Sequence, residues 1–128
     1  MKKKFIFAAI VVLAVFFIYF IGLGFLKNAS VYIDRYEISE DGQEITLDIG
    51  VAASAGFVRE AVVHQQEGGR LYIDFYSAFG GINGSIAAKN TFTLPLAEDT
   101  TMIGIYRNTN CYEAVLYKNE DGTWRRAA

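Results

Sequence analysis

The chain contains one histidine, His64, and one cysteine, Cys111, the residue types best suited to act as a general base or a nucleophile. A reactive cysteine needs a neighbouring cation or base, and Asn110, Tyr112 and Glu113 supply neither. With no second histidine or cysteine, a transition-metal site would depend on carboxylates. We therefore interpret His64 as exposed at a strand end and Cys111 as a small apolar residue. The sequence predicts no catalytic residue, no metal ligand and no cofactor.

Residues 80–85, with the sequence GGINGS, are rich in glycine, as are loops that bind phosphate. A P-loop ends in Gly-Lys-Ser/Thr before a helix, whereas here the next lysine is Lys89 and a strand is expected after it. We interpret the segment as a long surface connection, and such loops often carry ligand contacts. Two outward-facing tyrosines precede it, and tyrosine is enriched at protein interfaces. The sequence therefore predicts a contact surface formed by Tyr72, Tyr76, Gly80, Gly81 and Asn83.

Charge is distributed unevenly along the 128 residues, which include 12 Lys and Arg and 14 Asp and Glu. Residues 1–27 contain four lysines and no acidic residue, which leaves eight basic and all 14 acidic groups in residues 28–128. The resulting balance of −6 excludes the basic surface that nucleic-acid binding needs. It favours a basic or neutral partner.

Residues Phe5–Leu26 form an uncharged run of 22 residues. A helix needs about 20 apolar residues to cross a bilayer, so the run is long enough to span one. Three lysines precede it and only Lys27 follows, which favours a cytoplasmic N-terminus and export of the remainder. The alternative is a cleavable signal peptide, whose apolar region is usually only ~7–15 residues long. We expect residues 1–27 to form a basic start and a retained single-pass anchor, and residues 28–128 to form an extracytoplasmic domain.

From residue 31 onwards the sequence consists of short alternating segments separated by turn residues. In Glu44–Val51, for example, apolar side chains occupy every second position and polar ones lie between them, which is typical of a half-buried strand. The same pattern predicts strands at 31–38, 57–65, 70–79, 91–96, 101–107, 111–118 and 123–126. It predicts a core that includes Leu47, Ile49, Ile73 and Phe75. Seven or eight short strands favour an all-β fold, an antiparallel β-sandwich of the disulfide-free, immunoglobulin-like kind.

Two segments, FYSAFGGINGSIAAKNTFTLPL and IYR…CYEAVLYKNEDGTW, follow the lysine-rich start and the apolar run. In this combination the chain resembles small membrane-anchored ectodomains of Gram-positive Firmicutes. The resemblance covers most of residues 31–124. It implies a location at the cell membrane, and it carries no assigned chemistry.

Three functions are compatible with this organisation. The first is a membrane-tethered, non-enzymatic domain that binds a protein or a cell-envelope ligand. The second is a small envelope hydrolase, in which His64 would have to meet Ser77, Ser85 or Cys111 together with an aspartate. The third is a structural subunit of a membrane complex. The sequence identifies neither the ligand nor the oligomeric state.

Overall fold

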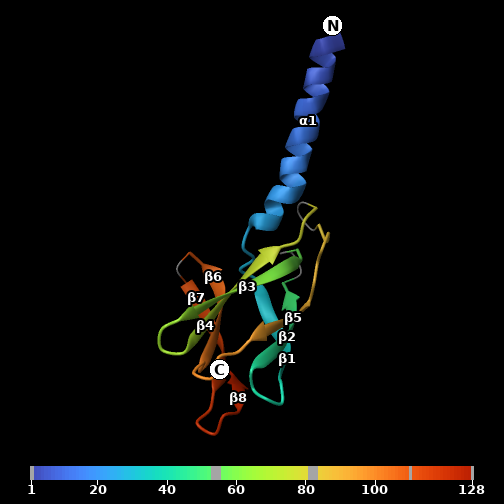
Figure 1. Cartoon of the computed structure of the whole chain (residues 1–128). Helices are drawn as coiled ribbons and strands as arrows, with labels where there is room; N and C mark the ends of the chain where they lie inside the picture. Colours follow the sequence, from blue (N-terminus) through green and yellow to red (C-terminus); the bar gives the residue numbers. More distant parts are fainter. Residues whose placement is uncertain (1, 53–55, 81–83, 110, 128) are drawn as a thin grey trace.

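The computed structural model describes residues 2–52, 56–80, 84–109 and 111–127. A helix, α1 (Lys2–Gly22), leads through a 3-10 turn, η1 (Leu23–Phe25), into a β-rich body, from one end of which α1 projects (Figure 1). The strands of the described residues are β1 (Val31–Ile38), β2 (Glu44–Val51), β3 (Val58–Gln66), β4 (Arg70–Ser77), β5 (Thr91–Pro95), β6 (Met102–Asn108), β7 (Cys111–Lys118) and β8 (Trp124–Arg126).

Helix α1 is apolar around its whole circumference after the initial lysines, and none of its residues is buried. Its 21 residues, at ~1.5 Å each, give a length of ~32 Å, close to the ~30 Å hydrocarbon thickness of a bilayer. In the described part of the chain, Lys2–Phe25 is the one helical segment long and apolar enough to cross a membrane, a property that signal sequences share. The helix is thus consistent with membrane anchoring, and its retention and orientation stay predictions.

The strands form two sheets, one with the order β1-β2-β5 and the other with the order β3-β4-β6-β7-β8. Their ladders are antiparallel with one exception, because β4 and β6 pair in parallel with Leu71 opposite Ile103. The expectation of a wholly antiparallel fold is wrong at this pair. Its physical reason is the crossover: β5 joins the other sheet, so the chain returns beside β4 in the same direction. Immunoglobulin domains have purely antiparallel sheets, so an immunoglobulin-like class is not established.

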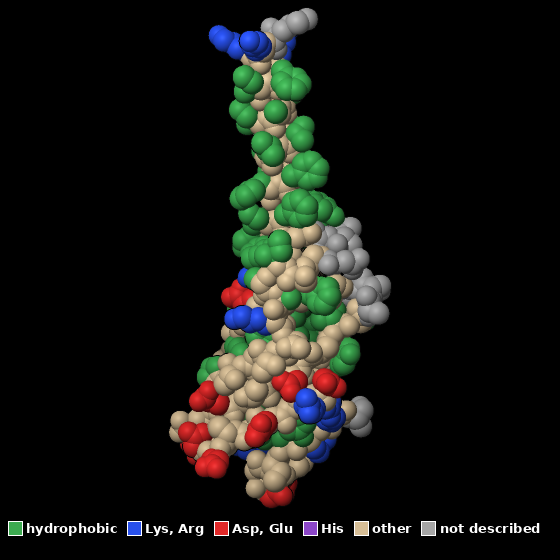
Figure 2. Space-filling view, turned by 90° about the vertical axis from the view of Figure 1, so that its right-hand side faces the viewer, with side chains coloured by type: hydrophobic (Ala, Val, Ile, Leu, Met, Phe, Trp, Pro, Cys, Tyr) green, Lys and Arg blue, Asp and Glu red, His purple; other side chains and the backbone are tan. Residues whose placement is uncertain are grey.

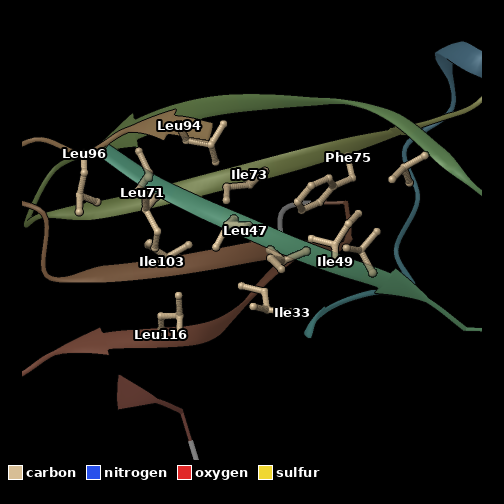
Figure 3. Packing of buried hydrophobic residues seen from close by; sticks show 14 residues of the cluster. Ile33, Leu47, Ile49, Leu71, Ile73, Phe75, Leu94, Leu96, Ile103 and Leu116 are labelled. Carbon is tan, nitrogen blue, oxygen red and sulfur yellow. The ribbon is translucent and has the colours of Figure 1, made fainter. Parts of the chain in front are cut away.

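One hydrophobic core lies between the two sheets (Figure 3). The alternation in β2 and β4 is confirmed, since Leu47, Ile73 and Phe75 are completely buried and Ile49 is nearly so. Both sheets contribute side chains to the same cluster, as they do in a β-sandwich. Its buried members are Val31, Ile33, Ile45, Leu47, Ile49, Val58, Leu71, Ile73, Phe75, Leu94, Leu96, Ile103, Ile105 and Leu116.

The segment that connects α1 to the body is hydrogen-bonded to the end of β4. The Ser77 amide donates to the Leu26 carbonyl at 2.9 Å, and the Asn28 amide donates to the Phe75 carbonyl at 2.6 Å. Lys27 lies opposite Tyr76 in this short antiparallel bridge. Since β3 occupies one side of β4, the connecting segment takes the other side, which β6 occupies further along. The junction is therefore built into the sheet, and Lys27 is brought next to β4.

Candidate functional site

The outer face of the five-stranded sheet carries a compact group of polar and aromatic side chains. Strand alternation places them there: the inward neighbours Leu71, Ile73 and Phe75 fill the core, so the residues between them face outwards. We refer to the group as the Asp74 cluster. It consists of Lys27 from the connecting segment, His64 from β3, Tyr72 and Asp74 from β4, Tyr106 from β6 and Tyr112 from β7.

Asp74 is buried although it lies on the outer face, with only 2% of its side chain exposed. Its Oδ1 accepts a hydrogen bond from the Tyr112 hydroxyl at 2.7 Å. Its Oδ2 lies 2.7 Å from Nε2 of His64 and 3.3 Å from Nζ of Lys27. His64 pairs directly with Tyr72 across the ladder, so Asp74 is its diagonal neighbour on the same face. Both carboxylate oxygens are thus occupied by groups of the chain itself.

These contacts decide the charge state of the cluster. Burial opposes ionisation of Asp74, but the hydrogen bonds from Tyr112, His64 and Lys27, together with the charge of Lys27, outweigh it and lower the pKa of Asp74. The hydrogen bond to Asp74 raises the pKa of Lys27. Burial, and then the hydrogen bond to the Asp74 carboxylate, raises the pKa of Tyr112 to about 12. Around neutral pH the cluster therefore holds an anionic Asp74, a cationic Lys27 and a neutral Tyr112.

Asp74 also fixes the orientation of His64. An ionised carboxylate can only accept hydrogen bonds, so Nε2 of His64 carries the proton and Nδ1 is left for other partners. The imidazole remains 44% exposed, which confirms the expected exposure, and it pairs with an aspartate, one of the partners that the hydrolase alternative requires. In the part of the chain that the structure describes, no serine or cysteine is hydrogen-bonded to His64, and no set of three acidic, histidine or cysteine side chains is arranged to hold a metal ion.

The tyrosines of the cluster are packed against one another. The rings of Tyr72 and Tyr112 stack with centroids 4.2 Å apart and an interplanar angle of 4°, and Tyr106 meets Tyr112 edge-on at 5.9 Å. Gly104 allows this stack, because a Cβ at its position would lie 3.1 Å from Cδ1 of Tyr72. Lys27 lies 4.9 Å from the ring centroid of Tyr106. The result is a preorganised aromatic surface with polar tips.

The predicted contact surface is divided in the structure. Tyr72 belongs to the Asp74 cluster, and Tyr76 is half-buried on the same face beside Lys27. Gly80 lies apart from them, against the end of α1, where its amide donates to the Phe20 carbonyl at 2.9 Å. Its φ of +107° is one that glycine adopts without strain. Gly81 and Asn83 lie outside the described residues.

Four members of the cluster were missed as site residues in the sequence analysis: Lys27, Asp74, Tyr106 and Tyr112. Asp74 offered a signal, since it is an acidic residue within an apolar strand and shares the outward face with the tyrosines on either side. Lys27 offered none, because its place beside β4 depends on how the connecting segment pairs. Cys111 is free and exposed, so its expected apolar role is not what the structure shows.

Comparison of the chain with protein-family models, with curated proteins and with solved structures finds no match. The resemblance to Firmicutes ectodomains thus depends on the sequence pattern alone.

Proposed function

We propose that this protein is a membrane-tethered, non-enzymatic binding or accessory domain. Its N-terminus lies in the cytoplasm, α1 is retained as a single-pass anchor, and the β-domain, an eight-stranded sandwich, is extracytoplasmic. The length and apolarity of α1 and the lysines at positions 2–4 support this arrangement. The strand count alone supports an immunoglobulin-like class.

The observation that carries the proposal is that both oxygens of Asp74 are engaged by groups of the chain itself. Tyr112, His64 and Lys27 satisfy both of its oxygens, so the buried carboxylate stabilises a fixed arrangement of side chains. What it holds in place is a surface of tyrosine rings and one imidazole. Such side chains lose little conformational entropy when they bind, which suits recognition of a protein or cell-envelope ligand.

One observation favours the envelope hydrolase as a second candidate. The Asp74–His64 pair resembles the orienting half of an acid–base dyad, with the imidazole of His64 44% exposed. Such an enzyme would have to activate water or a group of its substrate. The two candidates differ in what a conservative change at His64 does, because hydrolysis requires its imidazole, whereas a binding surface that depends mainly on tyrosine does not.

The native cysteine provides a test of topology. Cys111 is the single cysteine and is exposed, so a membrane-impermeant maleimide added to intact cells should label it if the β-domain is outside. The labelled chain should retain the mass of all 128 residues. Cys111→Ser is the control for non-specific labelling. Labelling only after the membrane is permeabilised, or a mature chain that begins near residue 25 or 30, would contradict the proposed anchorage.

Binding is tested by affinity capture of the full chain from detergent-solubilised membranes. Replacing Tyr72 and Tyr76 together by alanine should reduce partner recovery at least about tenfold, because an interface tyrosine that contributes ~2 kcal/mol changes affinity about 30-fold. The matched control is Tyr32→Ala, an exposed tyrosine on the other sheet. His64→Gln should leave recovery within a few-fold of wild type. Full recovery with the tyrosine pair removed would place the contact elsewhere.

A further inference from the structure

Large hydrophobic side chains are exposed at the end of the β-domain that carries α1. Phe25, Leu26, Phe57 and Ile86 are 64%, 55%, 50% and 63% exposed, and we call these four residues the junction patch. Residues 78 and 79 contact three of the four patch residues. The Phe79 ring meets that of Phe25 with centroids 6.2 Å apart, Phe79 pairs with Ile86, and the Ala78 amide donates to the Phe57 carbonyl. Scattered exposed apolar residues are ordinary, but a contiguous group marks a contact surface.

The junction patch is continuous with the apolar surface of α1. Gly80 donates to the Phe20 carbonyl of α1, and the Phe79 ring lies so close to Gly24 that it fills the space a Cβ there would need. Arg59 adds a third link, since its Nη2 donates to the Gly24 carbonyl at 2.6 Å and its guanidinium lies 4.4 Å from the Phe79 ring centroid. Whatever surrounds the C-terminal end of α1 therefore also meets the patch.

The acidic turns lie at the opposite end of the domain. Because Ser77 is bonded to Leu26, the other end of the eight-residue strand β4 lies ~25 Å from the connecting segment. The turn at 67–69 is there, and hydrogen bonds link it through Thr101 to Lys118, which places the turns at 97–100 and 119–122 near it. Figure 2 shows hydrophobic side chains along α1 and several acidic ones towards the opposite end of the molecule, with a further acidic side chain directly below α1. The Leu96 amide donates to the Gln43 carbonyl, which places the turn at 39–42 next to the turn at 97–100. The acidic residues of these four turns are Glu40, Asp41, Glu67, Glu98, Asp99, Glu120 and Asp121.

We propose that the junction patch is a second membrane contact, inserted at the boundary between headgroups and acyl chains of the bilayer that α1 crosses. The inference depends on the membrane anchorage within the proposed function. Interfacial apolar side chains reach about 5–10 Å into this boundary, and basic groups beside them favour the phosphates. Arg59 and Lys27 are the basic groups beside the patch, but each is paired with a carboxylate of the chain. Arg59 pairs with Glu60 at 2.8 Å and Lys27 pairs with Asp74 at 3.3 Å. The contact therefore depends mainly on the apolar side chains, while the acidic turns are kept away from anionic lipid. Because the junction patch is continuous with the surface of α1, the lipid that surrounds α1 is the partner that we infer for the patch.

The consequence is a domain that lies directly on the bilayer in one orientation. The connecting segment is hydrogen-bonded to β4, which fixes the domain to the end of α1. The junction patch adds further contacts between the same end of the domain and the bilayer, at other positions around α1. The Asp74 cluster, which includes Lys27 of that segment, is then presented at a fixed height close to the surface.

Fluorescence quenching in vesicles tests the inference with the full chain. In a Cys111→Ser background, an environment-sensitive fluorophore is attached after Phe57→Cys or Ile86→Cys, one position at a time. Phe16→Cys, within α1, reports on anchorage, and Glu120→Cys, in a far turn, is the aqueous control. The vesicles contain phosphatidylcholine and phosphatidylglycerol. Quenching by nitroxide-labelled lipid is compared with quenching by iodide in the water.

We expect nitroxide lipid to quench positions 57 and 86 several-fold more than position 120, and iodide to quench them several-fold less. If both positions behave like position 120, the patch does not touch lipid and the inference is wrong. Protection from iodide without quenching by lipid would also overturn it, since a protein surface, such as a second copy, would then cover the patch. Absence of lipid quenching at position 16 would instead refute the anchorage.

Discussion

Truncation of Phe75 to alanine should cost about 3–5 kcal/mol of unfolding free energy, the largest loss that we expect from any single substitution in the chain. Phe75 is completely buried between the two sheets, and its ring meets Phe92 at a centroid distance of 5.6 Å. The loss combines the transfer free energy of the ring with the cavity left behind. Leu47→Ala, Ile49→Ala and Ile73→Ala should each cost about 2–5 kcal/mol for the same reason. A domain with ~5–15 kcal/mol of stability has little margin for such a loss.

The measurement is urea unfolding of the full chain in detergent, followed by circular dichroism of the β-domain. The matched controls lie in α1, where Phe7→Ala and Leu13→Ala delete the same groups from exposed positions outside the core. Their urea midpoints should equal that of the wild type. If the Phe75→Ala midpoint also equals it, the packing between the sheets is not what stabilises the domain.

The face that each strand buries could be predicted from the sequence because it depends on local alternation alone. The apolar positions of β2 recur every second residue, and the period fixes the buried side wherever the neighbouring strand lies. Proline cannot donate a ladder hydrogen bond, which favours an edge or an end of a strand, and Pro95 is the last residue of β5, an outer strand of its sheet. The apolar run at the N-terminus was equally readable, since the length of a spanning helix is set by bilayer thickness.

What the sequence did not predict depends on pairing between distant segments. The parallel β4–β6 pair arises from the excursion of β5 into the other sheet, and nothing in either strand encodes it. The free edge of β1 is another example. Arg107 donates to the carbonyls of Ala29 and Val31, and Arg126 donates to those of Ile33 and Asp34. These arginines donate hydrogen bonds to carbonyl groups along the edge of β1 that no neighbouring strand pairs. They lie 76 to 93 residues away in the sequence, and no local pattern predicts contacts over such a separation.

The Asp74 cluster contains one feature that the sequence predicts and one that it does not. The alternation of β4 places Asp74 on the outward face with Tyr72, but it does not indicate what covers that face. Burial came from three separate segments that close over it, carrying Lys27, His64 and Tyr112. The exposure of a side chain depends on neighbouring segments, which the alternation of one strand does not describe. A single aspartate within an otherwise apolar strand can therefore indicate a buried polar network even where the alternation places it on the outer face.

Replacement of Asp74 by alanine should cost about 2–3 kcal/mol, since it leaves three polar groups without their common acceptor. The cost stays below the ~3–5 kcal/mol of a fully buried ion pair because Lys27 and His64 reach water and can be rehydrated. The control is Asp34→Ala, an exposed aspartate in β1, for which a change within about 0.5 kcal/mol is expected. Equal urea midpoints for the two variants would show that the cluster contributes nothing to stability.

Removing the charge of Asp74 should also change how the stability of the domain depends on pH. The pKa of Asp74 lies below its ordinary value of 3.8 in the folded chain, so its contribution is present above that pH and is lost as pH falls through the folded pKa. Tyr112 acts in the opposite range, because its pKa is raised from 10.0 to about 12. Its contribution is present below pH 10.0 and is lost as pH rises through about 12. Asp74→Asn, which keeps the shape and removes the charge, should weaken both dependences.

Ultraviolet titration of phenolate reports on this coupling directly. The chain has eight tyrosines, and Tyr112, whose pKa is raised to about 12, should contribute a component late in the titration. Tyr112→Phe should remove that late component and leave the rest of the curve unchanged. In Asp74→Asn, the component should move towards pH 10.0, because the carboxylate charge that opposes ionisation is gone while most of the burial remains. If the late component is unchanged in Asp74→Asn, Asp74 is not its cause, and the hydrogen bond at 2.7 Å does not hold the cluster together in solution.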